Sequence, residues 1–205
     1  MKEISVLPIF KYKKQSSDII VSTVSNSQGW NRQLSPFILG PCKLYDGYVS
    51  QNMENAWQFS KVYKLHTDRL GNPKPRYFDW AVKGWEDKKA HRYPMGKGAI
   101  PEYSYWKGKK LDYIQARKRI YGPLYIKAVI ETGAWETLIS VYENMTQNNR
   151  LVLLDYDAYD HASLGLTLSD VLNDPTRKMG HAFLLAMLLQ DDPALNEIKV
   201  KINGH

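Results

Sequence analysis

Residues 48–65 read Tyr-Val-Ser-Gln-Asn-Met-Glu-Asn-Ala-Trp-Gln-Phe-Ser-Lys-Val-Tyr-Lys-Leu and predict an amphipathic helix. Asn52 suits the N-cap position, because its side chain can accept hydrogen bonds from the free N–H groups of the first helical turn. From Met53 to Leu65 no proline or glycine interrupts the chain, so we expect one helix over that range. Apolar side chains recur at helical spacing on one face and predict a contact with the core: Ala56, Phe59 and Tyr63.

A second face of the same helix is polar. Glu54, Gln58 and Lys61 are four and three residues apart, so a helix would make them neighbours. A carboxylate, an amide and an ammonium group in one row can form a binding or catalytic site. They can equally form a solvated face on which Glu54 complements the helix dipole. The residues alone leave both interpretations open.

Composition limits the class of protein. The 205 residues are 43% hydrophobic, which is enough for a sizeable core and argues against global disorder. The single cysteine, Cys42, excludes an intramolecular disulfide and a cysteine-rich zinc site and favours a reducing, cytoplasmic setting. We expect no signal peptide, because the N-terminus lacks a long apolar run followed by a cleavage site. The longest apolar run, Ala182 to Leu189, is too short to cross a bilayer, so we expect no membrane partner.

Positive charge gathers in residues 64–112, which hold twelve Lys and Arg against six Asp and Glu. The same segment carries eight of the aromatic residues. Basic residues interleaved with aromatic ones suit a polyanion with bases that can stack, so nucleic acid or a nucleotide is a predicted partner. The alternative interpretation is a solvated basic surface over aromatic core residues.

The pattern along the chain predicts one α+β domain over residues 1–205, mainly helical, with a small sheet. Strands are expected at 4–10, 19–24, 151–154 and 198–202, with Pro8 marking the first as an edge strand or a broken one. Helices are expected at 78–89, 111–120, 124–132, 134–144, 167–172 and 176–190, in addition to the helix at 53–65. Residues 66–110 are rich in glycine and proline and are interpreted as a long irregular insertion that carries the basic and aromatic residues.

Two further carboxylates follow the apolar run at 151–154. Asp155 and Asp157 are two residues apart, which would place both on one side of a strand. If they meet Glu54 in a cleft, these carboxylates can activate water and stabilise a positive sugar carbon. Capping and turn chemistry is the alternative.

Metal and cofactor motifs are missing from the sequence. The five histidines show no paired spacing, and the acidic run near Asp155 lacks the glycine and glutamate of an EF-hand loop, so we expect no metal site. There is no dinucleotide-binding GxGxxG after a strand, no P-loop and no GxSxG elbow, so no cofactor is predicted. His181 opens an apolar segment and is interpreted as a satisfied buried histidine.

The order of these pieces resembles the NADAR superfamily. The resemblance is carried by Leu34-Ser35-Pro36-Phe37 and by the segment 48–63, with Glu54, Trp57, Gln58 and Lys61 at the positions that the family uses. The segments 151–157 and 180–189 follow in the family's order. The chain also resembles small uncharacterised proteins of bacteriophages, which implies a role in counter-defence or host takeover in the bacterial cytoplasm.

The resemblance implies hydrolysis of an N-glycosidic bond in an ADP-ribosylated nucleic acid or nucleotide. It implies Glu54 as the first catalytic carboxylate and Asp155 as the second. The substrate-binding residues that follow from it, or that lie beside these carboxylates, are Asn52, Trp57, Gln58, Lys61, Trp106, Arg117, Lys127 and Asp157. Two other functions remain open: a non-catalytic protein that binds nucleic acid or a nucleotide, and an inhibitor that docks on a host protein.

Overall fold

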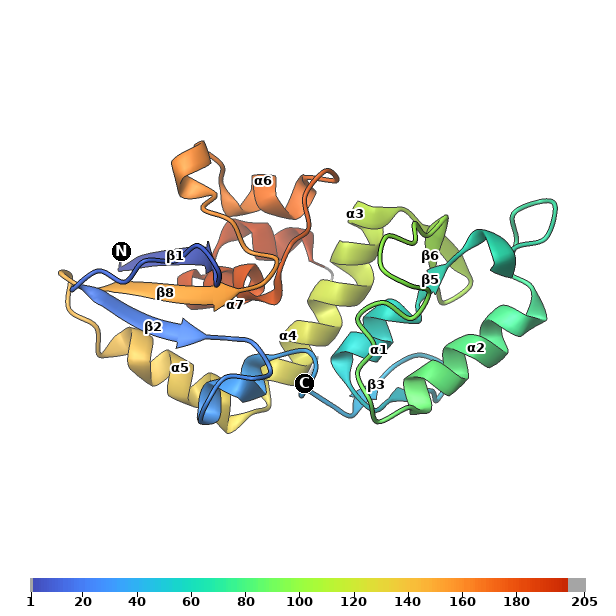
Figure 1. Cartoon of the computed structure of the whole chain (residues 1–205), viewed down its shortest axis with the longest axis horizontal. Coiled ribbons are helices and arrows are strands. Elements are labelled where there is room, and N and C mark those ends of the chain that lie inside the picture. The colour runs from blue at the N-terminus through green and yellow to red at the C-terminus, as the bar shows by residue number, and fades with distance from the viewer. Residues whose placement is uncertain (1, 199–205) are drawn as a thin grey trace.

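The computed structural model describes residues 2–198 and confirms an α+β architecture (Figure 1). The predicted strand at 198–202 lies outside these residues except for Ile198. The α-helices are α1 (Met53–Gln58), α2 (Pro75–Glu86), α3 (Tyr113–Ala116), α4 (Gly122–Ile130), α5 (Gly133–Glu143), α6 (Leu168–Asn173) and α7 (His181–Gln190). Short 3-10 helices are η1 (Trp30–Leu34), η2 (Lys64–His66), η4 (Ala162–Leu164) and η5 (Pro193–Glu197), and η3 (Arg117–Tyr121) is a π-helical turn.

The largest sheet has three parallel strands in the order β1 (Glu3–Pro8), β8 (Arg150–Asp155) and β2 (Asp18–Ser22). Of the two alternatives for the strand that contains Pro8, the edge strand is confirmed, since within residues 2–198 β1 pairs with β8 alone. Leu151 to Leu154 are buried on both faces of the central strand, as expected for a continuous apolar run. Helix α7 packs against β1 and β8. Because the strands are parallel, Asp155 stands at the carboxyl edge of the sheet, where ligands bind in open α/β sheets.

The predicted helix at 53–65 is confirmed only as far as Gln58. Residues 61–62 form β5 (Lys61–Val62), which pairs with β6 (Tyr103–Trp106), and β6 pairs with β7 (Lys109–Leu111). The Ser60 carbonyl accepts from the Tyr105 N–H at 2.8 Å and from the Tyr77 hydroxyl at 3.1 Å. These long-range partners take the carbonyl that a continuing helix would use, so tertiary pairing overrides local helix propensity.

The segment 66–110 is more regular than predicted. Helix α2 begins with Pro75 in its first turn and buries Tyr77, Ala81 and Trp85. Gly84 faces the ring of Phe59 so closely that an added Cβ would overlap it. The strands β6 and β7 close the segment, and a second small hairpin, β3 (Cys42–Lys43) with β4 (Val49–Ser50), packs against α2.

The predicted break between the helices at 111–120 and 124–132 is wrong. The chain runs from α3 through the π-helical turn η3 directly into α4, and Pro123 lies in the first turn of α4. Proline is tolerated there because first-turn N–H groups have no intrahelical partner. The separation of α4 from α5 near Gly133 is confirmed, with Thr132 as the N-cap.

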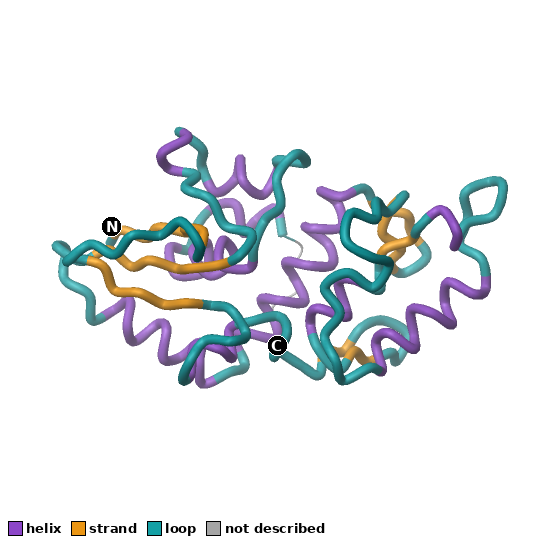
Figure 2. Tube along the Cα trace, viewed as in Figure 1, coloured by secondary structure: helices purple, strands orange, loops and turns teal. Residues whose placement is uncertain are grey.

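The last long helix begins later than predicted. Helix α7 starts at His181 rather than Thr176, and residues 174–180 form a loop between α6 and α7 (Figure 2). The buried guanidinium of Arg117 donates to the Asp174 carbonyl at 3.1 Å and to the Arg177 carbonyl at 2.9 Å. Those bonds fix the loop in a non-helical path.

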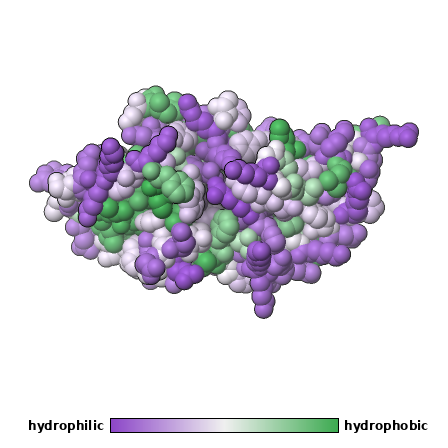
Figure 3. Space-filling view, viewed as in Figure 1, coloured by the Kyte–Doolittle hydropathy of each residue, from purple (hydrophilic) through white to green (hydrophobic). Residues whose placement is uncertain are grey.

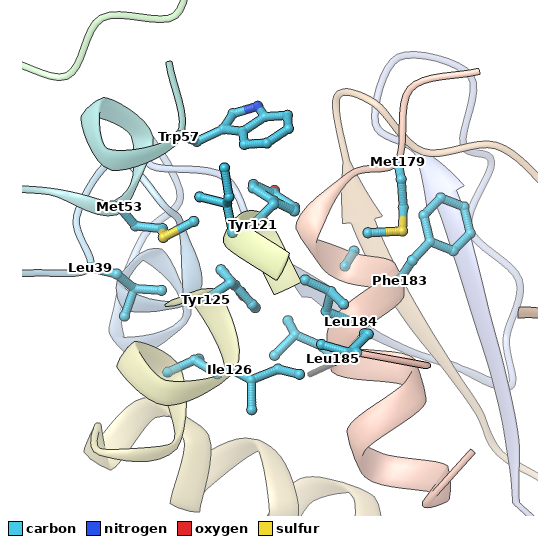
Figure 4. Packing of buried hydrophobic residues seen from close by; sticks show 14 of the residues in the cluster. Leu39, Met53, Trp57, Tyr121, Tyr125, Ile126, Met179, Phe183, Leu184 and Leu185 are labelled. Carbon is cyan, nitrogen blue, oxygen red and sulfur yellow. The ribbon is translucent and has the colours of Figure 1, made fainter. Parts of the chain in front are cut away.

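Helix α4 lies between the parallel sheet and the part that holds α1 and α2, and it contacts α1, α5 and α7 (Figure 1). Tyr125 of α4 is fully buried, and its hydroxyl donates to the Leu34 carbonyl at 2.7 Å. Figure 4 shows Met53 and Trp57 on one side of Tyr121 and Tyr125, and apolar side chains of α7 on the other. One hydrophobic cluster therefore joins the two parts of the molecule.

The surface view separates the two parts by character. Hydrophobic atoms gather over the parallel sheet, whereas hydrophilic atoms cover much of the part that contains α2 (Figure 3). Ile20 of β2 is 37% exposed at this surface. Within residues 2–198, none of the helices combines the length and the hydropathy that a membrane span requires.

Candidate functional site

A cleft of about 840 Å³ lies where the two parts of the molecule meet. Its walls come from α1, from the carboxyl end of β8, from the start of α7 and from the loop before β6. Glu54 and Asp155, a hundred residues apart in the sequence, line this same cleft together with Trp57. The structure therefore brings together the two carboxylates and one of the two tryptophans that the sequence singled out.

The predicted polar row on α1 is present as a chain of hydrogen bonds. The Gln58 amide donates to Oε1 of Glu54 at 2.9 Å, and Nζ of Lys61 donates to Oε1 of Gln58 at 2.7 Å. Nζ of Lys61 also lies 4.7 Å from the centre of the Trp57 ring. Although Lys61 is in β5 and not in a helix, the turn after α1 keeps it beside Gln58.

Burial shifts the pKa values of Glu54 and Lys61, the two residues at the ends of this hydrogen-bonded row. Burial raises the pKa of Glu54, although the Gln58 hydrogen bond and the charges of Lys61, Arg92 and His181 act in the opposite direction. Burial lowers the pKa of Lys61 to about 8, against the attraction of Glu54. A buried carboxylate with a raised pKa, joined through Gln58 to an ammonium group with a lowered pKa, suits a general base or acid.

Asp155 is held by a different set of partners. Its Oδ2 lies 3.0 Å from Nδ1 of His181 and accepts from the Ala182 N–H at 3.3 Å, and its Oδ1 accepts from the Tyr156 N–H at 2.6 Å. Nε2 of His181 lies 2.9 Å from the Thr23 carbonyl. Both ring nitrogens of His181 thus face acceptors, which favours the doubly protonated imidazolium.

The pKa values agree with that assignment. Burial alone would raise the pKa of Asp155, but the charge and hydrogen bond of His181 hold it below its ordinary value. Burial alone would lower the pKa of His181, but Asp155 and the Thr23 carbonyl raise it. The two carboxylates of the cleft therefore differ in proton affinity, because the pKa of Asp155 is lowered and the pKa of Glu54 is raised.

Gly180 allows Asp155 to approach the start of α7. A Cβ at Gly180 would overlap the Oδ2 atom of Asp155, and the Gly180 N–H donates to the Asp157 carbonyl at 3.1 Å. The carboxylate lies close to the first N–H groups of α7, where the helix dipole favours negative charge. This close packing explains why a glycine precedes His181.

Positive side chains gather around Asp157 at the cleft. Arg92 pairs with Asp157 at 2.8 Å, and Nζ of Lys178 lies 3.9 Å from the same carboxylate. Both cations also lie over the Tyr93 ring, at 5.5 and 5.7 Å from its centre. With Lys61, these residues give the cleft three cationic side chains that can face a phosphate group.

Aromatic rings complete the cleft. Trp57 lies 5.2 Å from Tyr121 and 6.4 Å from Tyr113, measured between ring centres. Tyr113, Tyr93 and Tyr156 are 39%, 42% and 37% exposed, so each offers a ring face on which a base can stack. Tyr121 is buried below them, and its pKa is raised well above its ordinary value by burial and by the charges of Asp155 and Glu54.

Three predicted substrate-binding residues do not line the cleft. Asn52 caps α1 by accepting from the Asn55 N–H at 2.8 Å, and its amide group reaches the carbonyls of residues 87 and 88. Trp106 is buried with its ring centre 4.7 Å from that of Tyr45. Lys127 is exposed on α4, outside the cleft lining. These three side chains therefore lie apart from the carboxylates of the cleft.

Arg117 borders the cleft but serves the fold. The residue is 2% exposed, and its guanidinium donates to four backbone carbonyls, those of Val171, Leu172, Asp174 and Arg177. With these bonds made, it anchors the loop before α7, so the predicted phosphate contact is replaced by a structural one.

Sequence reasoning missed Arg92, Lys178 and the exposed tyrosines. Arg92 and Tyr93 lie in the segment singled out for its interleaved basic and aromatic residues, so that signal pointed to the region without identifying the pair. Lys178 was assigned to a helix that does not exist at that position. Within residues 2–198, no group of three or more His, Cys, Asp and Glu side chains is arranged to hold a metal ion.

Residues 9–185 match the protein family described as "Family of unknown function (DUF6939)". The chain belongs to this family. The match spans both parts of the molecule and reaches into α7, so it includes both carboxylates of the cleft. No curated protein and no solved structure matches the chain.

Proposed function

We propose that this DUF6939 protein hydrolyses an N-glycosidic bond in an ADP-ribosylated nucleic acid or nucleotide. The observation that carries the proposal is the pairing of Glu54 and Asp155 in one cleft with different proton affinities. Hydrolysis of a glycosidic bond passes through an oxocarbenium-like state, for which a carboxylate positions water or stabilises the cation. The resemblance to the NADAR superfamily, in which Glu54 occupies the position of the family's glutamate, supports the same chemistry.

Glu54 is the residue proposed to act on water. In the ionised form its carboxylate takes a proton from a water molecule as the oxygen attacks the anomeric carbon. The carbon–nitrogen bond breaks, its electron pair leaves with the base, and the proton passes to the base nitrogen. Gln58 holds one oxygen of Glu54 in place, since its amide is itself oriented by Lys61.

Asp155 acts through its charge in this proposal. Its oxygens already accept from His181, Ala182 and Tyr156, so it does not need to give up a protein partner to remain ionised. A fixed negative charge facing the cleft stabilises the positive sugar carbon in the transition state.

The cations and rings of the cleft supply binding. Lys61, Arg92 and Lys178 match the two phosphate groups of an ADP-ribose moiety. Tyr113 and Trp57 lie on the side of Glu54 and can flank the leaving base, and a base that has been flipped out of a stack needs such an aromatic wall. A role in phage counter-defence or host takeover belongs to the same proposal and rests on the resemblance alone.

The test is release of product from ADP-ribosylated single-stranded DNA, with NAD and ADP-ribose as parallel substrates, followed by mass spectrometry. Glu54→Gln should abolish release and keep ligand affinity within a few-fold, because the amide is nearly the same size. Glu136→Gln, at an exposed position of α5, is the matched control and should leave release unchanged.

The second function, binding without chemistry, is favoured by the three cations at the cleft. It predicts no release from any substrate, together with affinity that falls steeply as salt rises. Release that survives in Glu54→Gln would remove Glu54 from the mechanism.

A further inference from the structure

A second, smaller pocket lies apart from the cleft, between the β3–β4 hairpin, α2 and the β6–β7 hairpin. Its volume is about 240 Å³. Six of its lining residues are aromatic or acidic: Tyr45, Asp46, Tyr48, Phe78, Trp85 and Tyr105. Val82 and Gly108 complete the lining, so the described residues that form this aromatic pocket include no lysine or arginine. Although the protein has a net charge of +7, the only charged side chain among the described residues that line this pocket is the carboxylate of Asp46, which favours a cationic ligand.

Three of the four contacting ring pairs in the aromatic pocket meet nearly at right angles, and the fourth, Tyr48 with Trp85, meets at 50° and 5.4 Å. The Tyr45 ring makes an angle of 79° with Tyr48 at 5.9 Å and 83° with Trp85 at 6.1 Å. Phe78 and Tyr105 meet at 82° and 5.5 Å. A flat base stacks best in a slot with parallel walls. Perpendicular rings instead offer π faces in several directions, which suits a compact cation.

The backbone builds this arrangement with a tight turn. Asp46 and Gly47 both have positive φ, at 49° and 81°, and the Tyr48 N–H donates to the Tyr45 carbonyl at 2.9 Å. Positive φ at both central positions is the signature of a type I′ turn, which favours Asp-Gly. The Gln51 N–H donates to the Trp85 carbonyl at 2.8 Å and fastens the hairpin to the end of α2.

We propose that the aromatic pocket binds a methylated ammonium group. The ring faces attract the cation through their quadrupoles, and the Asp46 carboxylate adds a counter-charge at the rim. The absence of lysine and arginine from the lining disfavours phosphate, so this site is separate in chemistry from the cleft. The group can be carried by a trimethylated lysine of a peptide or by a small molecule such as choline. The proposal does not depend on the N-glycosidase activity.

The test uses the full-length protein and three probes: choline, a peptide with one trimethyllysine, and 3,3-dimethylbutanol, the uncharged isostere of choline. Binding is followed by tryptophan fluorescence and by the NMR signal of the Trp85 indole N–H. We expect at least one of the two cations to bind about tenfold more tightly than the isostere. Tighter binding of the peptide would identify a protein partner, and tighter binding of choline a small molecule; both support the proposal.

Two variants separate the cation effect from folding. Asp46→Asn keeps the turn, since asparagine also tolerates positive φ, and should weaken cation binding several-fold while leaving the isostere unaffected. Tyr48→Leu should weaken the cations more than the isostere, and Tyr142→Leu on α5 is the control that should change neither. Equal affinity for cation and isostere, preference for a nucleotide, or no saturable binding of any probe would overturn the proposal.

Discussion

Replacing His181 by leucine should destabilise the protein strongly, because it leaves the Asp155 carboxylate buried without its counter-charge. The two side chains are 7% and 5% exposed, and their nearest atoms are 3.0 Å apart. At an effective dielectric of about 20, Coulomb's law gives an attraction of roughly 5.5 kcal/mol at that distance. Removing one partner of a buried pair costs about 3–5 kcal/mol, so we expect His181→Leu to lose about 4 kcal/mol.

The pH dependence distinguishes this explanation from lost packing. In the wild type, the pKa of His181 is higher in the folded state than in the unfolded state, where it is near 6.5. The resulting stabilisation is fully present when the pH is below the unfolded-state pKa. This stabilisation is lost as the pH rises through the pKa of His181 in the folded state. In His181→Leu, burial without a counter-charge raises the pKa of Asp155, so the folded state binds the extra proton. Stability of the variant should then increase as the pH falls from 7 to 5.

The assay is urea unfolding at pH 5, 6 and 7, followed by fluorescence. The stability of the variant should be lowest at pH 7 and should rise toward pH 5, because protonation of Asp155 removes the uncompensated buried charge. Adding Asp155→Asn to the leucine variant should restore part of the stability at pH 7, because no buried charge remains. A variant stability that does not rise from pH 7 to 5, with no recovery in the double variant, would refute the charge argument and indicate a packing defect.

Three further predictions follow from the cleft and its supports. The pH profile of kcat/KM should rise through the raised pKa of Glu54 and fall near pH 8 as Lys61 loses its proton; a profile that stays flat from pH 5 to 9 would contradict both assignments. Arg117→Met should lower the free energy of unfolding by about 3 kcal/mol, because it leaves backbone carbonyls without a donor, and the loss should be measured as a lower Tm. Arg119→Met, at an exposed position, should leave the Tm unchanged, and equal Tm values for the two variants would contradict the anchoring role of Arg117. Gly180→Ala should lower activity at least tenfold by displacing the carboxylate at the end of β8, measured as product release; full activity would show that this carboxylate can move.

Much of the fold follows from local signals that the sequence displays. The apolar run before Asp155 predicts β8, because a strand that is buried on both faces does not need to alternate apolar and polar side chains. Asn52 gives the start of α1, and Thr132 and Thr167 give the starts of α5 and α6, since each side chain caps the helix that follows.

Other parts depend on partners that are distant in the chain. Helix α1 ends at Gln58 because Tyr77 and Tyr105 take the carbonyl of Ser60, and no local pattern announces that contact. The late start of α7 depends on Arg117, which lies more than fifty residues earlier. The sequence of residues 176–180 is compatible with a helix and does not show that the guanidinium of Arg117 binds the backbone carbonyls of this loop.

The candidate site divides in the same way. The row of Glu54, Gln58 and Lys61 could be predicted, because neighbours in one turn stay together whether or not the helix continues. The meeting of Glu54 with Asp155 could only be hypothesised, since it depends on how α4 joins the two parts. Arg92 could not be predicted as a site residue, because its partner, Asp157, is sixty-five residues away in the sequence.

The most direct test of the central claim is hydrolysis of ADP-ribosylated single-stranded DNA in water enriched in oxygen-18. Attack by a water molecule that Glu54 activates predicts one heavy oxygen in the released ADP-ribose, none in the freed DNA base, and loss of release in Glu54→Gln. No release by the wild type, or labelled release that is as fast in Glu54→Gln as in the wild type, would contradict the claim.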